Sequence, residues 1–288
     1  MQLPVKILFR IAVCLHIGIL FYGCEDYVPG LSMTKIDNNF YLFPGDGGNS
    51  AVLLSDSIVF IIDTKVKDGS EKLHTWVEKK AKGKKEIVVN THFHRDHTGG
   101  NHLYPDARII AGNYGDSLWL QFNSAEDKPN EWIAASKELT IGDEDVLIQN
   151  VGEAHTFDDV VVYLKKRKVL FTGDVVLNRY HPYLQREAGA SINKYMSACD
   201  WMISNFEINL VVPGHGETGG DDLIDNFRQY FIDMKEAANN ANSMVTMESK
   251  YGDYKSVPVN KAGFDETIQF IREDESGNII LPSDTLSR

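Results

Sequence analysis

The chain has 288 residues, of which 43% are hydrophobic and 24% are charged, a balance typical of a globular protein. Its formal net charge of −12 argues against nucleic-acid binding, because proteins that follow a phosphate backbone present a basic surface. The length is compatible with one large α/β domain, and no low-complexity or proline-rich segment marks a linker.

Residues 1–23 have the pattern of an export signal. Lys6 and Arg10 precede an apolar stretch that is shorter than the roughly 20 residues needed to span a membrane. Gly23 and Cys24 at its end are similar to the end of a bacterial lipobox. We therefore expect removal of the signal and lipidation of Cys24, which would attach a periplasmic or outer-membrane lipoprotein to the membrane. A simple secretory signal cleaved nearby is the alternative.

Runs of branched and aromatic residues predict strands, and apolar residues at helical spacing predict helices. The predicted strands are 34–43, 50–54, 57–63, 86–90, 108–111, 146–151, 160–164, 168–172 and 208–212. The predicted helices are 70–82, 98–104, 114–122, 195–206, 221–247 and 264–272. Cys199 lies within one of these helices and is expected to be a buried apolar residue. The segment from about residue 250 is less patterned, and residues 24–288 are treated as one domain.

The motif at residues 90–101 is the most informative part of the chain. His92, His94, Asp96 and His97 place four metal-binding groups within six residues. A helix would point positions 92, 94 and 97 in different directions, whereas a tight loop can turn them toward one point. Imidazole nitrogens bind zinc, copper, iron or nickel, and a neighbouring carboxylate favours a divalent cation. A surface loop that is merely rich in histidine is the alternative interpretation.

Three further candidate ligands stand at the ends of predicted strands. They are His155 in Gly-Glu-Ala-His-Thr, Asp174 in Leu-Phe-Thr-Gly-Asp and His215 in Val-Val-Pro-Gly-His-Gly. With the first motif they offer enough groups for two metal ions that keep open positions for water and substrate. Alternating strands and helices in both halves predict an α+β fold, an αββα sandwich whose site lies at one edge.

These motifs, in this order, resemble those of the metallo-β-lactamase-fold hydrolase superfamily over roughly residues 32–247. The resemblance implies a sandwich of two mixed β-sheets flanked by helices. It implies a first metal bound by His92, His94 and His155, a second bound by Asp96, His97 and His215, and Asp174 bridging both. Two Zn²⁺ ions are the expected cofactors, with iron or manganese as alternatives.

The resemblance also implies that metal-bound hydroxide attacks the substrate, because a divalent metal lowers the pKa of bound water from about 15.7 toward 7. Asp96 would orient that hydroxide. Asp63 would support the histidine loop, unless it caps the following helix instead. Tyr180 and His181 follow the bridging aspartate closely, and either could donate a proton or stabilise an oxyanion. Alternatively, their loop only packs aromatic rings over the core.

The expected substrate is a small ester, lactone, thioester or amide, and no nucleic-acid partner is expected. Asp174 stands where the best-known β-lactam-cleaving members have cysteine or serine, yet residues 90–101 are similar to their periplasmic branch. Hydrolysis of β-lactams is therefore one alternative, and an iron-dependent dioxygenase acting on sulfur compounds is another. A metal-binding protein without turnover is disfavoured, because the ligand set is complete.

Overall fold

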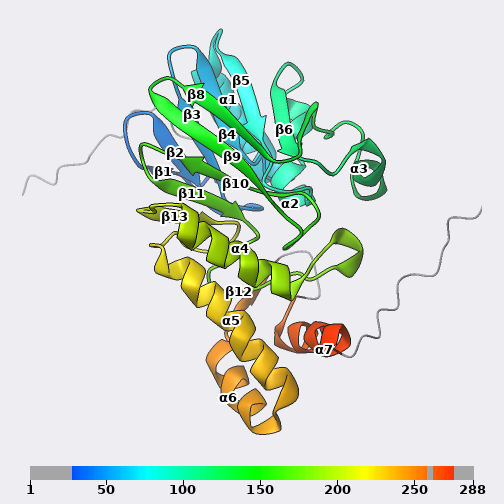
Figure 1. Ribbon diagram of the computed structural model, residues 1–288. Coiled ribbons are helices and arrows are strands. Elements are labelled where there is room, and N and C mark those ends of the chain that lie inside the picture. Colours follow the sequence, from blue (N-terminus) through cyan, green and yellow to red (C-terminus); the bar gives the residue numbers. More distant parts are fainter. Residues whose placement is uncertain (1–27, 258–261, 276–288) are drawn as a thin grey trace, which may run out of the picture.

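Two β-sheets lie face to face with helices on both outer sides in the computed structural model, which describes residues 28–257 and 262–275 (Figure 1). The predicted signal at residues 1–23 and the lipidation site at Cys24 lie outside the described residues. Among the described helices, none is long and apolar enough to cross a membrane. The predicted αββα sandwich of two mixed sheets is confirmed.

The first sheet has seven strands in sequence order, from β1 to β7. Its strands are β1 (Thr34–Lys35), β2 (Phe40–Phe43), β3 (Ser50–Leu54), β4 (Ile58–Ile62), β5 (Lys85–Val89), β6 (Arg108–Gly112) and β7 (Glu131–Ile133). The pairs from β1 to β4 are antiparallel, and those from β4 to β7 are parallel.

The second sheet has five strands in the order β13-β11-β10-β9-β8. They are β8 (Ser136–Ile141), β9 (Glu144–Gly152), β10 (Asp159–Leu164), β11 (Val169–Gly173) and β13 (Leu210–Pro213). Only the β11–β13 pair is parallel. A separate short pair joins β12 (Tyr180–His181) to β14 (Lys255–Ser256) in parallel.

Helices cover the outer face of each sheet. The α-helices are α1 (Asp68–Ala81), α2 (Arg95–Thr98), α3 (Asp116–Phe122), α4 (Ile192–Asn205), α5 (Asp222–Asn239), α6 (Ala241–Tyr251) and α7 (Phe264–Glu275). Short 3₁₀ turns lie at Asn101–Leu103 and Arg186–Ala188. Helix α1 packs on the first sheet, whereas α4, α5 and α7 join the core on the second sheet's outer face (Figure 1).

The strands β2, β3, β4, β10 and β11 read as nearly continuous apolar runs because both of their faces are buried. In β2, Phe40 and Leu42 point into the core between the sheets, whereas Tyr41 and Phe43 point outward to α1. The Trp76 ring on α1 lies 4.8 Å from the Tyr41 ring and 4.9 Å from the Phe43 ring. Burying each such aromatic side chain stabilises the fold by about 1.5–3 kcal/mol.

Two predicted elements are interrupted by local hydrogen bonds. The strand predicted at 34–43 is divided by a turn, in which the Asn39 amide donates to the Asp37 carboxylate at 2.9 Å. The helix predicted at 221–247 ends at Asn239, and the Asn240 side chain then caps α6 by accepting from the amides of Asn242 and Ser243.

The helix predicted at 98–104 is wrong, because the chain there passes too close to a neighbouring loop. Helix α2 already ends at Thr98, and only a 3₁₀ turn follows at Asn101–Leu103. A Cβ on Gly100 would lie 2.4 Å from the carbonyl oxygen of Thr64, so this contact requires glycine. The strands β7 and β8 were not predicted, whereas the helix predicted at 264–272 is confirmed by α7.

Candidate metal centre

All seven predicted metal-binding side chains gather at one edge of the sandwich. His92, His94, Asp96 and His97 follow the end of β5, at Val89. In the second sheet, β10 runs antiparallel to β11 and β11 runs parallel to β13. The start of β10 and the ends of β11 and β13 therefore meet at one edge. His155, Asp174 and His215 flank these three strand ends.

The first cluster brings together His92, His94, His155 and Asp174. The Nδ1 atom of His94 lies 3.1 Å from Nε2 of His92 and 2.8 Å from Nε2 of His155. Burial lowers the pKa of His92 well below its usual value, that of His94 to about 4 and that of His155 to about 3. All three imidazoles are therefore neutral at pH 7, which is the form that binds a metal.

The second cluster contains Asp96, His97 and His215. The Nε2 atom of His215 lies 3.0 Å from Oδ2 of Asp96. Burial alone would raise the pKa of Asp96, but the electrostatic effect of the nearby His97 and His215 rings lowers it to about 2. Asp96 is therefore an ionised carboxylate at neutral pH.

Asp174 lies between the two clusters. Its Oδ1 atom is 3.2 Å from Nε2 of His97, and its Oδ2 atom is 3.5 Å from Nε2 of His155. Each carboxylate oxygen therefore faces a different cluster. This arrangement agrees with the bridging position that the sequence motifs imply.

The geometry of both clusters fits metal ions. The metal-facing atoms of each cluster lie within 4.8 Å of one another. Among the described residues, three buried atoms that face the clusters have no hydrogen-bond partner, namely Nε2 of His97 and His215 and Oδ1 of Asp174. Buried polar atoms without a partner are costly unless another group satisfies them, and a cation can do so here. Zinc accepts this combination of imidazole and carboxylate ligands.

Asp63 holds the histidine loop from behind. Its carboxylate accepts from the amide and the hydroxyl of Thr91, both at 2.8 Å, and lies 2.7 Å from Nδ1 of His97. With Nδ1 bound to Asp63, the Nε2 atom of His97 is turned toward the cluster. The supporting position that we predicted for Asp63 is therefore confirmed. It does not cap α1, whose N-cap residue is Lys67.

Tyr195 holds His155 in the corresponding way, and no sequence motif pointed to it. The Tyr195 hydroxyl on α4 lies 2.7 Å from Nδ1 of His155. Both side chains are almost fully buried. Asp159 fixes the same loop, since its carboxylate accepts from the backbone amides of Ala154, His155 and Thr156. The orientation of His155 is therefore set by the second sheet and α4 together.

The clusters are packed so closely against two loops that the positions of Gly48 and Gly214 require glycine. A Cβ on Gly48 would lie 2.2 Å from a carbon of the His97 ring. A Cβ on Gly214 would lie 1.9 Å from Oδ1 of Asp174. Both distances are far inside contact distance, so any larger residue would displace a candidate ligand.

The loop at residues 44–49 closes one side of the centre and is tied down at both ends. The buried Lys65 ammonium donates to the carbonyl oxygens of Phe43 at 2.7 Å and Gly48 at 3.0 Å, and also to that of Gly45. The Asn49 side chain donates to the carbonyl oxygens of Pro213, the last residue of β13, and of Gly216 just after it. The loop thus connects the first sheet to the end of the second.

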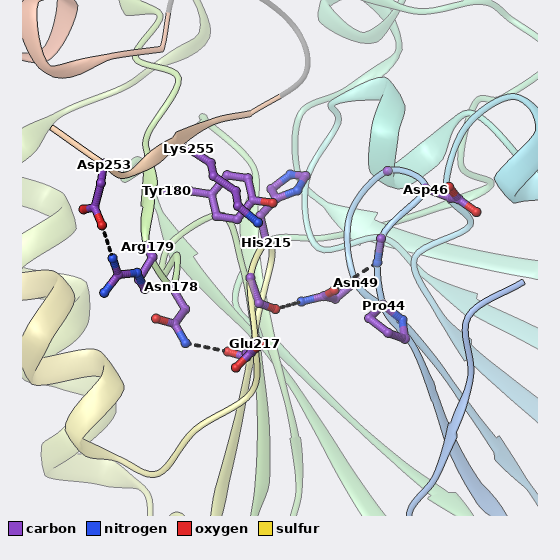
Figure 2. A pocket seen from close by; sticks show the side chains of 13 residues that line it. Pro44, Asp46, Asn49, Asn178, Arg179, Tyr180, His215, Glu217, Asp253 and Lys255 are labelled. Atoms are coloured by element: carbon purple, nitrogen blue, oxygen red, sulfur yellow. Dashed lines mark hydrogen bonds and ion pairs between the residues drawn. The ribbon is translucent and has the colours of Figure 1, made fainter. Parts of the chain in front are cut away.

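A cavity of about 790 Å³ opens beside His215, and Figure 2 shows the side chains that line it. Its walls are the 44–49 loop, the segment 178–180, residues 215–217, and Asp253 and Lys255. Figure 2 shows the Tyr180 hydroxyl directed toward the His215 ring, and the two ring centres are 5.7 Å apart. Tyr180 therefore has access to any molecule that approaches His215.

His181 faces the opposite way from Tyr180. Its side chain is buried, and its Nδ1 atom lies 2.8 Å from the hydroxyl of Tyr230 on α5. Its ring also packs against Tyr254. The structure therefore brings Tyr180, but not His181, to the cavity beside the metal clusters. The predicted burial of Cys199 is confirmed, because its side chain has no exposed surface.

Comparison with known proteins identifies relatives of this arrangement. A family model of the metallo-beta-lactamase superfamily matches residues 44–215. Metallo-beta-lactamase type 2 of Bacillus cereus is 27% identical over 204 residues, which cover 67% of this chain and 80% of that protein. Metallo-beta-lactamase type 2 of Bacteroides fragilis is 24% identical over 212 residues, which cover 69% of this chain and 84% of that protein.

The fold has relatives among solved structures as well. A metallo-beta-lactamase from Pontibacter korlensis has a TM-score of 0.61 with this chain at 23% sequence identity, covering 70% of this chain and 98% of the other. The family match covers more than half of the chain, from the loop that closes the centre to the last candidate ligand. On that match, the chain belongs to the metallo-beta-lactamase superfamily.

Proposed function

We propose that this chain is a binuclear metal-dependent hydrolase that acts on a small ester, lactone, thioester or amide. The observation that carries the proposal is the pair of adjacent clusters, in each of which histidine nitrogens and aspartate oxygens converge within 4.8 Å of one another. The first ion would be held by His92, His94 and His155, the second by Asp96, His97 and His215, with Asp174 between them. Zinc is the metal that we propose for both positions.

When bound, such ions lower the pKa of a coordinated water and polarise the oxygen of the bond to be cleaved. Asp96 is ionised at neutral pH and can orient the attacking water by accepting its hydrogen bond. Asp174 contributes negative charge to both clusters, which reduces repulsion between two cations. Tyr180 borders the cavity, where its hydroxyl can donate to an oxygen that becomes negative during the reaction.

Hydrolysis of β-lactams is the second candidate. It is favoured by the names of the relatives at 27% and 24% identity, both of which are called metallo-beta-lactamase type 2. The activity in these names is that of the relatives and not of this chain. The substrate of this chain depends on the loops that border its cavity. A substrate comparison is therefore needed to separate the two candidates.

The test is a substrate panel on protein loaded with zinc, iron or manganese, with metal content and turnover measured on the same preparations. We expect zinc-loaded protein to hydrolyse at least one ester, lactone, thioester or amide, and Asp96→Asn to lose that activity. Turnover restricted to β-lactams would favour the second candidate. Oxygen uptake with a sulfur compound by iron-loaded protein, without hydrolysis of any member of the panel, would contradict the proposal.

A further inference from the structure

The C-terminal helix α7 contacts the loop between β12 and α4, although this helix lies beyond the family match, which ends at residue 215. The contact is made by one side chain. The Arg186 guanidinium donates to the Asp274 carboxylate at 2.9 Å and to the carbonyl oxygen of Phe270 at 2.5 Å. It also lies 3.8 Å from the centre of the Phe270 ring. Arg186 therefore links α7 to this loop through directed contacts.

Helix α7 is itself fixed to the body of the protein. Ile268 and Ile271 are buried in the core on the outer face of the second sheet. On the other side of the helix, the Arg272 side chain donates to the carbonyl oxygen of Ala238, near the end of α5, at 2.9 Å. The helix can therefore hold Arg186 in a constant position.

The turn that begins at Arg186 is hydrogen-bonded to the segment that carries His155. The Phe157 amide donates to the carbonyl oxygen of Ala188 at 2.8 Å, and the Ser191 amide donates to that of Ala154 at 2.9 Å. The two bonds lie on either side of His155. The position of this ligand along the chain is therefore set by the loop that Arg186 fastens to α7.

The same turn also reaches the histidine loop. Ala188 is fully buried and belongs to the same apolar cluster as Phe93, which stands between His92 and His94. All three histidines of the first cluster are thus adjacent to residues that pack on this turn. In the second cluster, by contrast, His97 is held from the first sheet through its contact with Asp63.

We propose that Arg186 is a positioning residue for the first metal ion, because it fastens the turn at residues 186–189 to α7 and thereby holds His92, His94 and His155 in place. This inference rests on the proposed function, which assigns a metal to that cluster. Ligands that are already held in place lose less conformational entropy when the ion binds. The C-terminal helix thus contributes metal affinity to a centre that the matched region builds.

The test measures the zinc affinity of each cluster separately, by competition with a chelator. In a His215→Ala background the second cluster lacks a ligand, so the measured dissociation constant is that of the first. In a His94→Ala background the first cluster lacks a ligand, and the constant is that of the second. Arg186→Met is compared with the native arginine in both backgrounds.

We expect Arg186→Met to weaken zinc binding by about three- to tenfold at the first cluster, less than the roughly 10- to 100-fold loss on removing a direct partner of a ligand. The second cluster should keep its affinity. Arg186→Lys retains a donor for Asp274, so its loss at the first cluster should be smaller. This variant also provides the comparison if Arg186→Met does not fold.

Hydrogen exchange in the metal-free protein is a second readout that does not depend on binding. The amides of Phe157 and Ser191 should exchange about three- to tenfold faster in Arg186→Met, because the turn that holds them opens more often. The Asn178 amide donates to the carbonyl oxygen of His215 at 3.0 Å, beside the second cluster, and should exchange at the wild-type rate.

Arg108→Met is the matched control, because Arg108 also donates two hydrogen bonds to a partner, the Glu131 carboxylate. It lies at the start of β6, at the sheet edge opposite the clusters. It should leave both zinc affinities unchanged.

An unchanged affinity of the first cluster in Arg186→Met would overturn the proposal, and so would an equal loss at both clusters, which would indicate general destabilisation. If neither background binds zinc even with Arg186 present, the proposed function itself is contradicted, which distinguishes the two failures.

Discussion

Two carboxylates of the centre, Asp96 and Asp174, have different surroundings although both are ionised. Asp96 contacts only the second cluster, through His215 and His97. Asp174 contacts both clusters, with one oxygen facing each. Replacing them should therefore have different effects on metal content and on turnover.

Asp96→Asn should retain most of the first metal, whose ligands include three histidines, but lose at least about 100-fold in turnover. A misplaced nucleophile has an effect of this size. Asp174→Ala should reduce occupancy of both positions, because each loses a ligand. Metal analysis and kinetics on the same preparations distinguish the two variants. Full activity of Asp96→Asn with two metals bound would contradict the assigned role.

Tyr195 provides a test of how strongly the residues around the first cluster affect its affinity for metal. Tyr195→Phe keeps the ring, which packs 4.8 Å from the Phe231 ring, but removes the hydroxyl that contacts His155. We expect metal affinity at the first position to fall about 10- to 100-fold, the usual effect of losing such a partner. Competition with a chelator measures this change.

Tyr163→Phe is the control for Tyr195→Phe. It removes a hydroxyl that donates to the carbonyl oxygen of Glu207, remote from the candidate ligands. Its metal affinity should equal that of the wild type. If both variants bind metal as tightly as the wild type, the hydroxyl of Tyr195 does not support His155.

The candidate ligands were predictable because their motifs are local in sequence and each stands at the end of a strand. The supporting residues were less predictable, because their partners are distant along the chain. Asp63 could be inferred from the resemblance, whereas Tyr195 lies on a helix 40 residues from His155 and looks like any core tyrosine. Lys65 and Asn49 act through backbone carbonyl groups, which no side-chain motif reveals.

At the scale of elements, helices α5 and α6 are joined by one buried carboxylate. Asp233 on α5 accepts from Gln229 on its own helix at 2.6 Å, and from Lys250 at 2.7 Å and Tyr251 at 2.6 Å on α6. Burial raises its pKa, but these hydrogen bonds outweigh burial and leave the pKa below its usual value. Ionised Asp233 therefore stabilises the packing of α6 against α5.

Asp233→Asn should lower the free energy of unfolding by about 1.5–3 kcal/mol at pH 7, the range for hydrogen bonds to a charged group. Because the folded pKa lies below the unfolded value of about 3.9, this stabilisation is complete above that value and is lost as pH falls through the folded pKa. The difference between wild type and variant should therefore be constant from pH 5 to 7 and shrink below about pH 4.

Urea denaturation over this pH range measures the difference. Asp200→Asn serves as control, because Asp200 is exposed and pairs with Arg228 on the surface, where a single ion pair contributes little. A difference between Asp233→Asn and wild type that did not change with pH would show that packing, rather than the charge of Asp233, accounts for the loss.

Elements with a clear apolar pattern were predicted well, and their ends were not. The strands β9, β10, β11 and β13 and the helices α1 and α7 appear close to where the pattern placed them. The break at Asn240 depends on a capping hydrogen bond, and the irregular turn after α2 depends on contact between Gly100 and Thr64. The first is a local hydrogen bond and the second a tertiary contact. Both override helix propensity, and an apolar pattern alone does not reveal either.

At the scale of the whole molecule, bound metal should stabilise the fold. A ligand at about 100 times its dissociation constant adds about 2.7 kcal/mol when it binds only the folded state. For a chain of this size that corresponds to a rise in Tm of roughly 5–10 °C. Calorimetry of zinc-loaded protein before and after chelation measures this shift. An unchanged Tm after complete removal of metal would show that the clusters are already stable without it.

Each sheet is made from one continuous stretch of chain, residues 34–133 for the first and 136–213 for the second. Each metal cluster nevertheless combines ligands from the first stretch with ligands that lie in the second stretch or, for His215, just after it. During synthesis, His92 to His97 therefore emerge long before His155, Asp174 and His215 exist to complete either set. A metal-sensitive signal in refolding should appear only in the phase in which the two halves dock. Metal binding would thus indicate that the two halves have docked. A partly folded chain, in which they have not docked, would bind its ions weakly.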